Sequence, residues 1–283
     1  MIPDEVVEWL DVNDFGVVES TQRVSGGCIN NGLRLETSSG HSFFLKTNQR
    51  TPQDMFAREA EGLNALRVED GPRVPEPYVH GPTFLLLEDL QPAGHDQDYW
   101  STFGRLLACL HSHHHSKFGF EHDNYIGSNP QPNPWTENGY DFFAEHRLGY
   151  QAEMARGRGL LGRQEVRQVA ALSRRLPELV PEQPASLIHG DLWSGNATSD
   201  SQGAPAIIDP AAHFGWAEAE LAMTALFGTF PNDFYSAYQE VRPLEPGFRE
   251  RFSIYNLYHL LNHLNLFGGS YLSQVTSILR RFQ

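Results

Sequence analysis

The sequence predicts a two-lobed α+β protein, with a small sheet-containing lobe first and a larger, mostly helical lobe after it. Residues 15–90 hold short apolar runs separated by turn residues, which is typical of strands, whereas the chain after Pro92 has mainly helical periodicity. One strand-rich island, over 187–209, interrupts the helical part. A small sheet joined to a helical layer leaves a cleft between the two. We therefore expect an amino-terminal lobe over 1–89 and a carboxy-terminal lobe over 90–283.

The amino-terminal lobe follows from the alternation of apolar runs and turns. Ser38-Ser39-Gly40 is a turn between two such runs, and Phe56, Ala60 and Leu63 fall near one stripe of a helix. A proline-rich stretch over 72–77 breaks the helical pattern. The expected elements are a short helix near 6–10, strands over 15–24, 31–37 and 42–46, a helix over 54–67 and a strand over 83–88.

The carboxy-terminal lobe is expected to consist of helices packed around the island. Their apolar residues recur at helical spacing, so that one face of each helix can be buried. The histidines at 111 and 113–115, at the end of the first of these helices, are expected to be solvated rather than to bind a metal. The expected helices cover 99–111, 139–156, 163–176, 218–227, 248–266 and 271–282.

Composition places the chain among soluble globular proteins. It has 283 residues, of which 40% are hydrophobic and 20% charged, and its 21 basic and 35 acidic side chains give a net charge of 21 − 35 = −14. Duplex nucleic acid and anionic membranes are bound through clustered Lys and Arg, so this balance disfavours both as partners. A neutral or cationic small substrate suits it better.

Targeting and redox features point to the cytoplasm. The opening residues, MIPDEVVEWLD, are acidic and lack the basic start of a secretory signal. The best apolar run, over 84–87, is far shorter than the roughly 18 residues of a membrane span. The two cysteines, Cys28 and Cys109, have no metal-ligand spacing and make no disulfide framework. We expect a cytoplasmic protein with reduced thiols.

The island carries the side chains best suited to chemistry. Asp191 and Asp209 each follow an apolar strand, and Asn196 lies five residues after the first of them, so the three side chains can converge. Asn and Asp oxygens are ligands that Mg²⁺ accepts beside phosphates and water, and a further Asp can take the proton of an attacking hydroxyl. The alternative is that each Asp only caps a turn. The whole set, with His189 upstream and strands on both sides, favours chemistry.

Lysine usage indicates another functional position. The chain has only two lysines, Lys46 and Lys117, and the first ends an apolar strand, where an unpaired charge costs several kcal/mol if it is buried. Glu59 on the following helix can pair with it, in the Lys–Glu arrangement that holds ATP phosphates in kinases. The alternative is a surface lysine on an edge strand. The scarcity of lysine and the downstream island together favour a functional role.

Two further segments are assigned by their place in the expected topology. Gly26 and Gly27 lie between the first two strands, where a phosphate-covering loop belongs, although they do not match the Gly-x-Gly-x-x-Gly spacing. Glu88, Asp89 and Leu90 follow the last strand of the lobe, at the hinge where backbone groups would meet the edge of an adenine.

The functional residues of the island follow one another in the same order as in protein kinases, where a catalytic-loop Asp is followed by an Asn and then by a metal-binding Asp. The island has His-Gly-Asp where protein kinases have His-Arg-Asp, and Ile-Asp-Pro where they have Asp-Phe-Gly. With these residues, the chain resembles the fructosamine kinase (ketosamine-3-kinase) family, in the aminoglycoside and choline kinase-like branch of the bilobal protein-kinase-like fold. The likeness covers nearly the whole chain, and the run HGDLWSGN over 189–196 is quite specific to it. The matching segments are 26–30, 44–46, 59–63, 187–196, 208–211, 220–224, 227–228 and 258–265.

The resemblance implies ATP-dependent phosphorylation of the 3-hydroxyl of a ketoamine, which is a sugar attached to an amine, as a deglycation repair step. By the same likeness, Asp191 is the base, and Asn196 and Asp209 are the Mg²⁺ ligands. Lys46 is the phosphate clamp, with Glu59 behind it. The expected partner is a small-molecule or protein-bound ketoamine.

Three residues are candidates for substrate contact: Trp193, Trp216 and His263. His263 shares a helix face with His259, where packing against the catalytic loop or the sugar is expected before metal binding. Trp216 belongs to the segment GWAEAELAM over 215–223, where the family usually has GHREADLAM. The tryptophan can stack on a sugar ring or simply fill space. This departure bears on substrate identity more than on catalysis.

Cys28 falls in the expected phosphate loop and admits two interpretations. A free cysteine is commonly a small, half-buried hydrophobic residue. Members of the family carry a redox-sensitive cysteine at this place, so the resemblance also implies a disulfide between two chains. The expected assembly is a monomer or a redox-dependent homodimer.

Other function classes stay open beside a ketoamine kinase. A kinase for another hydroxylated amine, such as an aminoglycoside or choline, fits the same catalytic set. A nucleotide-binding pseudokinase is disfavoured because the full set of catalytic side chains is present. A Ser/Thr protein kinase is disfavoured because no Asp-Phe-Gly or Ala-Pro-Glu segment frames an activation loop.

Overall fold

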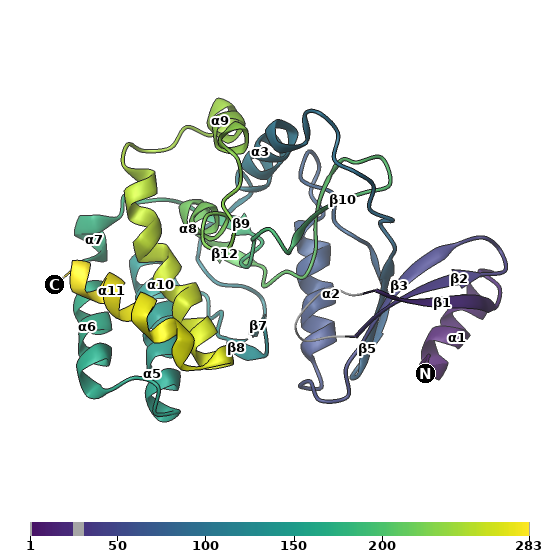
Figure 1. Cartoon of the computed structure of the whole chain (residues 1–283), viewed down its shortest axis with the longest axis horizontal. Helices are drawn as coiled ribbons and strands as arrows, with labels where there is room; N and C mark the ends of the chain where they lie inside the picture. The colour runs from purple at the N-terminus through teal and green to yellow at the C-terminus, as the bar shows by residue number, and fades with distance from the viewer. Residues whose placement is uncertain (1, 25–30, 283) are drawn as a thin grey trace.

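The computed structural model describes residues 2–24 and 31–282 and has the expected two-lobed α+β architecture. Figure 1 shows the lobe with the larger sheet on one side and the helical lobe on the other. The last strand of the sheet ends at Glu88, next to the lobe boundary that we predict after residue 89. Within the described ranges, no helix is both long and apolar enough to cross a bilayer.

The amino-terminal lobe is built on one antiparallel sheet of five strands. Apolar side chains of the sheet pack against one helix from each face. The elements are α1 (Asp4–Val12), β1 (Val18–Val24), β2 (Asn31–Thr37), β3 (Ser42–Thr47), α2 (Met55–Leu66), β4 (Pro77–Gly81) and β5 (Phe84–Glu88), with the strand order β1-β2-β3-β5-β4.

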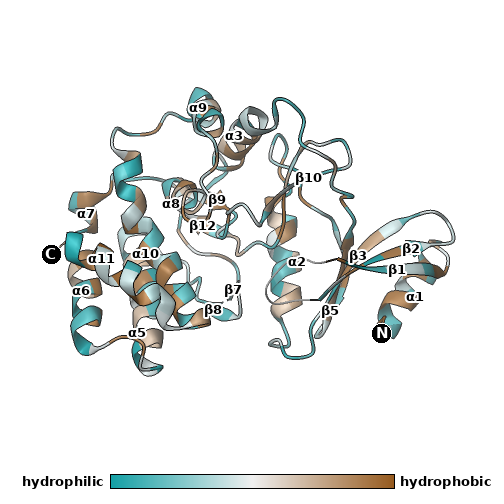
Figure 2. Ribbon diagram, viewed as in Figure 1, coloured by the Kyte–Doolittle hydropathy of each residue, from teal (hydrophilic) through white to brown (hydrophobic). Residues whose placement is uncertain are grey.

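The alternation of side chains along β3 decides where its lysine points. Phe43 and Leu45 pack in a cluster with Val6 and Leu10 of α1. Because successive side chains of a strand point to opposite faces, Lys46 lies on the other face of the sheet, toward α2. Among the interior strands, β3 and β5 are the apolar ones, and Figure 2 colours much of both brown.

Two details of this lobe differ from the expectation. Strand β4 is not among the expected strands, because it begins at Pro77, the last residue of the proline-rich stretch. It lies at the edge of the sheet, where one side of the strand needs no N–H donor and proline is tolerated. The first strand begins at Val18 rather than at residue 15, since Gly16 turns the chain with φ +76° and Phe15 stacks on Trp9 at 5.3 Å.

The carboxy-terminal lobe is organised around one long helix, α10. This helix packs against α5, α8 and α11, so most of its twenty residues are buried. The elements of the lobe are α3 (Tyr99–Leu110), β6 (His114–His115), β7 (Asn124–Ile126), β8 (Asn129–Gln131), α4 (Gly139–Phe142), the π-helix η1 (Phe143–Gly149), α5 (Tyr150–Gly157), α6 (Arg163–Arg174), α7 (Leu176–Leu179), β9 (Ala185–Ile188), β10 (Ala197–Ser199), β11 (Pro205–Ile207), β12 (His213–Gly215), α8 (Ala217–Met223), α9 (Asn232–Val241), α10 (Phe248–Phe267), the 3₁₀ turn η2 (Gly269–Tyr271) and α11 (Leu272–Arg281).

Helix α9 is absent from the expected set. Its buried face is mainly aromatic, with Phe234, Tyr235 and Tyr238, and so short an apolar run does not distinguish a helix from a strand. It packs closely on α3, because a Cβ at Gly104 would lie 2.2 Å from the carbonyl oxygen of Phe234. The helix thus exists through tertiary contact rather than through a sequence signal.

The helix expected over 139–156 is present but is not regular. Its middle third, η1, is a π-helix, which is rare and cannot be inferred from periodicity. In η1, Arg147 faces the interior, where it donates hydrogen bonds to the carbonyl oxygen of Pro132 and to Oδ1 of Asn133, both at 2.7 Å. Burial lowers the pKa of this guanidinium to about 10.

The island contributes strands to two small antiparallel sheets. Strand β9 lies between β12 and β6, and β10 pairs with β11. The backbone N–H of Ile208 donates to the carbonyl oxygen of Asn196 at 3.1 Å, and that of Ala211 donates to His189 at 2.9 Å. These bonds hold the segment after β11 against the loop between β9 and β10.

Candidate active site

The loop over 189–196 is held in a tight turn between β9 and β10. Gly190 has φ +84°, and a Cβ there would lie 2.2 Å from the carbonyl oxygen of Ala211, so the turn requires glycine. His189 is fully buried, and its Nε2 lies 2.8 Å from the carbonyl oxygen of Ile208. We call this segment the catalytic loop.

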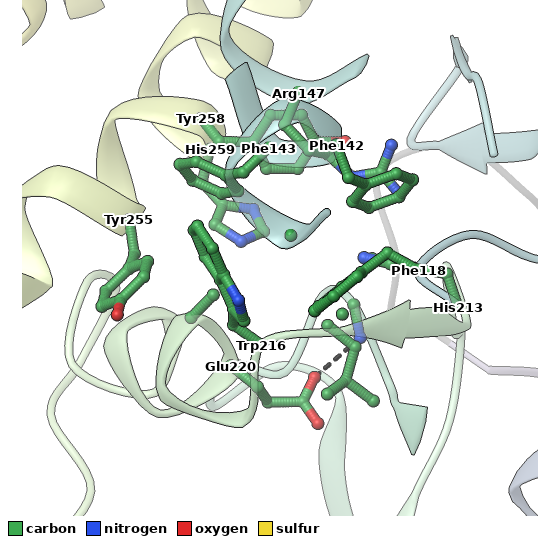
Figure 3. A pocket seen from close by; sticks show the side chains of 15 residues that line it. Phe118, Phe142, Phe143, Arg147, His213, Trp216, Glu220, Tyr255, Tyr258 and His259 are labelled. Carbon is green, nitrogen blue, oxygen red and sulfur yellow. Dashed lines mark hydrogen bonds between the residues drawn. The ribbon is translucent and has the colours of Figure 1, made fainter. Parts of the chain in front are cut away.

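Glu220 of α8 anchors the catalytic loop from below. Its carboxylate accepts hydrogen bonds from the backbone N–H groups of His189 at 2.9 Å and Gly190 at 2.7 Å, and His111 Nε2 lies 2.9 Å from it. Figure 3 shows this side chain at the base of the pocket. Burial would raise the pKa of Glu220, but the hydrogen bonds from His111 and from the backbone of His189 outweigh it and hold this pKa below its usual range. A glutamate at this position therefore serves as an ionised acceptor for the loop backbone.

The expectation that the histidine cluster is solvated is wrong for His111. The side chain is fully buried, with Nδ1 2.8 Å from the hydroxyl of Tyr238, because the end of α3 turns it toward α8 and α9. The three histidines over 113–115 are exposed as expected. Burial lowers the pKa of His111, so it meets Glu220 as a neutral ring.

Asp191 stands at the open side of the loop, with its side chain 22% exposed. Asn196 Nδ2 donates to the backbone carbonyl of Asp191 at 2.8 Å and lies 3.4 Å from its Oδ2, so the two predicted residues are neighbours. Burial raises the pKa of Asp191 well above its usual value, and the negative charges of Asp209 and Glu220 act in the same direction. A carboxylate with a raised pKa is a better proton acceptor.

Lys46, Glu59 and Asp209 form one ion-pair cluster that joins the two lobes. Lys46 Nζ lies 2.5 Å from Glu59 Oε1 and also pairs with Asp209 Oδ1. Burial alone would lower the pKa of Lys46, but the two carboxylates outweigh it and raise this pKa. Asp209 has φ +60°, an uncommon backbone conformation for a residue with a side chain, and such conformations occur most often at functional sites.

The donor set suits Mg²⁺. Asn196 uses its Nδ2 on the catalytic loop, which leaves its carbonyl oxygen as a ligand, and Asp209 supplies a carboxylate that is 37% exposed. In the part of the chain that the structure describes, no three or more His, Cys, Asp or Glu side chains form a metal site of their own. An ion at Asn196 and Asp209 would therefore need phosphate oxygens and water to complete its coordination.

The hinge residues use their side chains for structure. Glu88 pairs with Arg73, while Asp89 accepts hydrogen bonds from Arg34 Nε and Ser42 Oγ, both at 2.5 Å. Leu90 is buried. Any nucleotide contact of this segment would come from its backbone, as the topology predicts, and that contact stays a prediction.

Gly26, Gly27 and Cys28 lie outside the described residues, so their assignments stay predictions.

Two of the three substrate candidates lie close together. Trp193 and His263 both contact Phe227, with ring centroids 6.2 and 4.4 Å from it. Trp216 is only 3% exposed and lies in the interior, beside Tyr255 and the other rings in Figure 3. There it lines a cavity of about 20 Å³, enough for about one water molecule. Sugar contacts by these three residues stay predictions.

His259 lies beside Asp191, on the helix face that we expect to pack against the catalytic loop or the sugar. Its Nδ1 lies 4.0 Å from Asp191 Oδ1 and has no hydrogen-bond partner among the described residues. Burial and the positive charges of His263 and Arg147 lower its pKa to about 3, so the ring is neutral. Its spacing from His263 was the available signal, and it placed both rings on one helix face without indicating Asp191.

Comparisons with known proteins agree with this geometry. The family model described as fructosamine kinase matches residues 8–283. A "Probable ketoamine kinase" of Synechocystis is 45% identical over 271 residues, covering 93% of this chain and 90% of that protein. A chloroplastic "Protein-ribulosamine 3-kinase" of Oryza sativa subsp. indica is 41% identical over 287 residues, covering 98% and 82%.

Solved structures give the same result for the fold. A proposed fructosamine-3-kinase from Thermobifida fusca has a TM-score of 0.87 and 32% identity, covering 97% of this chain and 96% of that one. A choline kinase from Streptococcus pneumoniae has a TM-score of 0.59 at 14% identity, which shows a shared fold alone. The predicted protein-kinase-like fold is therefore confirmed.

Proposed function

The chain belongs to the fructosamine kinase family, and from this premise we propose that it transfers a phosphoryl group from ATP to the 3-hydroxyl of ketoamines. The observation that supports the proposal best is the convergence of Asp191, Asn196 and Asp209 with the Lys46–Glu59 pair at the junction of the two lobes. Relatives named ketoamine kinase and ribulosamine 3-kinase support the acceptor class.

Asp191 acts as the base in this proposal. Its carboxylate accepts the proton of the sugar hydroxyl as that oxygen attacks the terminal phosphorus of ATP. The raised pKa of Asp191 favours this proton transfer, and Asn196 holds the loop so that the carboxylate keeps its orientation. The backbone N–H groups bonded to Glu220 fix the loop from the opposite side.

Lys46 binds the phosphates of ATP, and Glu59 keeps its ammonium group in place through the 2.5 Å ion pair. Asn196 and Asp209 would hold Mg²⁺, which when bound neutralises negative charge on the phosphates. Asp209 pairs with Lys46 in the structure, so both carboxylates near the ammonium group keep it charged and positioned.

The first experiment is Mg·ATP turnover on ribulose-, erythrulose- and fructose-lysine, with an aminoglycoside and choline beside them. We expect phosphate on the 3-hydroxyl of at least one ketoamine, located by NMR of the product. Turnover on the aminoglycoside or choline alone would replace the proposal with a kinase for another amine. ATP binding without turnover on any acceptor would indicate a pseudokinase.

Compartment and assembly belong to the same proposal. We place the protein in the cytoplasm, as a monomer or as a dimer joined through Cys28 under oxidising conditions. Non-reducing gels after treatment with an oxidant should show a dimer that Cys28→Ser abolishes and Cys109→Ser retains. The same dimer in Cys28→Ser would exclude this disulfide.

A further inference from the structure

A second pocket lies beside Trp216, and none of the described residues that we assign to catalysis or to ATP lines it. It measures about 350 Å³, which is within the range of sites for small organic ligands. Phe118, Gly139 and Trp216 line both this pocket and the 20 Å³ cavity of Figure 3, so these three residues lie between the two. Exposed residues border the second pocket, and we call it the outer pocket.

The outer pocket has a negative character. Glu182 has neither an ion pair nor a hydrogen bond across the described stretches of chain. Glu137 lies 3.6 Å from Lys117 Nζ, but its side chain is 85% exposed, and exposed ion pairs contribute little. Burial and the charge of Glu182 raise the pKa of Tyr140, so this carboxylate acts on the phenol that lines the pocket. A cation in the pocket would therefore meet two carboxylates.

Trp216 supplies a hydrogen-bond donor that the protein itself does not use. The residue is 3% exposed, and its Nε1 donates no hydrogen bond to a described residue. Buried indole N–H groups usually have an acceptor. A Cβ at Gly139 would lie 2.7 Å from this nitrogen, so the glycine keeps space beside it, and Gly139 lines the outer pocket. The N–H group can therefore reach an oxygen atom of a ligand.

Aromatic rings form much of the remaining wall. The ring centroids of Tyr140 and Phe118 lie 5.4 and 6.3 Å from that of Trp216, and Figure 3 shows the Trp216 indole between the rings of Tyr255 and Phe118. Asn138 caps α4 with its Oδ1, which leaves its amide nitrogen to face a ligand. Aromatic faces attract cations and also cover apolar stems, so these rings suit the same ligand as the carboxylates.

We propose that the outer pocket is a second, non-catalytic site, which binds a small organic cation that also carries a neutral oxygen acceptor. Glu137 and Glu182 hold the cation, and Trp216 Nε1 donates to the oxygen. A carboxylate on the ligand is disfavoured, because the two glutamates would repel it. Amides of basic amino acids are ligands of this class. Trp216 stands where the family usually has histidine, and the inference does not depend on the proposed kinase activity.

The probe for this site is Nα-acetyl-arginine amide. It has a guanidinium group and neutral carbonyl oxygens but no hydroxyl, so it cannot be a phosphoryl acceptor. In protein with ¹⁵N-labelled indoles, we expect the Trp216 N–H resonance, identified by its loss in Trp216→Phe, to shift saturably with a Kd of about 1 mM. Nα-acetyl-citrulline amide has nearly the same shape without the charge and should bind about tenfold more weakly.

Three variants test whether the outer pocket is the place of binding. Glu137→Gln and Glu182→Gln should each raise the Kd of the arginine amide about threefold to tenfold. Glu178→Gln is the matched control, because Glu178 on α7 is also exposed, at 71%, but does not line the pocket. ADP with Mg²⁺ should leave the Kd unchanged, since the nucleotide site is separate.

Three results would overturn the proposal. The first is the absence of a saturable Trp216 shift, and the second is a Kd that changes equally in all three glutamate variants or in none. The third is displacement of the probe by a ketoamine, which would place the cation in the acceptor site instead. Thermal melting of each variant, matched to wild type, shows that the Kd values come from folded protein.

Discussion

At the residue scale, the proton acceptor is the position with the clearest consequence. Asp191→Asn keeps the shape of the side chain but removes its basicity, so phosphoryl transfer should fall by about 10²- to 10⁴-fold. ATP binding should change little, because Lys46 and Asp209 are untouched. Single-turnover rates and ATP titration measure the two quantities. Turnover near the wild-type value would show that Asp191 is not the base.

Substitution of Asp209 should affect ATP binding rather than proton transfer, because this residue is proposed to act through Mg²⁺. Asp209→Asn should weaken ATP affinity in the presence of Mg²⁺ by about tenfold or more, since a charged ligand is lost. With EDTA present, the affinities of the mutant and wild type for ATP should come much closer together. Calorimetric titrations with and without Mg²⁺ test this, and an equal loss of affinity in both conditions would contradict the metal role.

The residues that carry chemistry could be identified from the sequence to different degrees. Asp191, Asn196 and Asp209 are close in the chain and at strand ends, and Lys46 is conspicuous because lysine is scarce. Their neighbours could not be identified in the same way. The spacing of His259 and His263 indicates a helix face that packs against the catalytic loop or the sugar, but the approach of His259 to Asp191 in particular depends on how α10 packs.

At the scale of elements, two hydrogen-bond contacts at α2 join it to the other lobe, beside the apolar packing of Gly62 on Pro210 and Ala212. Tyr125 of β7 donates a 2.6 Å hydrogen bond to Asp54 just before α2, and His122 Nδ1 lies 2.7 Å from Glu61 of α2. Between these two contacts on the helix lies Glu59, the partner of Lys46. The contacts therefore hold α2 in the orientation that positions the phosphate-binding lysine.

Removing both connections should affect ATP more than fold stability. For Tyr125→Phe combined with His122→Ala, we expect kcat/KM for ATP to fall about threefold to tenfold, because the Lys46–Glu59 pair loses its external support. Arg156→Ala is the matched control, since it breaks an exposed ion pair with Glu153 on α5. Steady-state kinetics at varied ATP concentration measure this effect. Equal kcat/KM values for ATP in the wild type, the double variant and Arg156→Ala would show that these contacts do not support the Lys46–Glu59 pair.

The elements themselves show which signals a sequence carries. Strands β2 and β3 were predictable because alternating or consecutive apolar side chains mark them. Helix α10 was predictable because its twenty residues contain no glycine or proline and lie between Gly247 and Gly268. The edge strand β4, the π-helix η1 and the short helix α9 were not, because each depends on neighbours that supply its packing or hydrogen bonds. The missing signals are tertiary in each case.

At the scale of the whole molecule, the interior contains an unusual group of neutral histidines. His111, His189, His213 and His259 are all buried, and burial lowers the pKa of each below its usual value. In the unfolded chain these rings return to an ordinary pKa near 6.5. Below that pH the histidines of the unfolded state bind protons, whereas those of the folded state do not, so acid shifts the equilibrium toward unfolding.

Two groups act against the histidines. The pKa values of Asp191 and Glu59 are raised in the folded state, so these carboxyl groups oppose the histidines as the pH falls. Because four buried histidines outnumber the two carboxyl groups, we expect the free energy of unfolding to decrease below about pH 6. Urea titrations at several pH values between 7 and 5 should show this decline in the free energy of unfolding.

A single substitution tests whether the buried histidines cause this pH dependence of the unfolding free energy. His259→Asn removes one ring whose pKa is about 3 in the folded protein, so the pH slope of the unfolding free energy should decrease by about 1.4 kcal/mol per unit, even if stability at pH 7 also falls. His80→Asn, at an exposed position on β4, is the control and should leave the slope unchanged. The slope is informative where the stability alone is not, because a cavity lowers stability equally at every pH and only a lost proton site changes the slope. Identical slopes in wild type and His259→Asn would mean that this ring is protonated in the folded state and that the acid sensitivity has another origin.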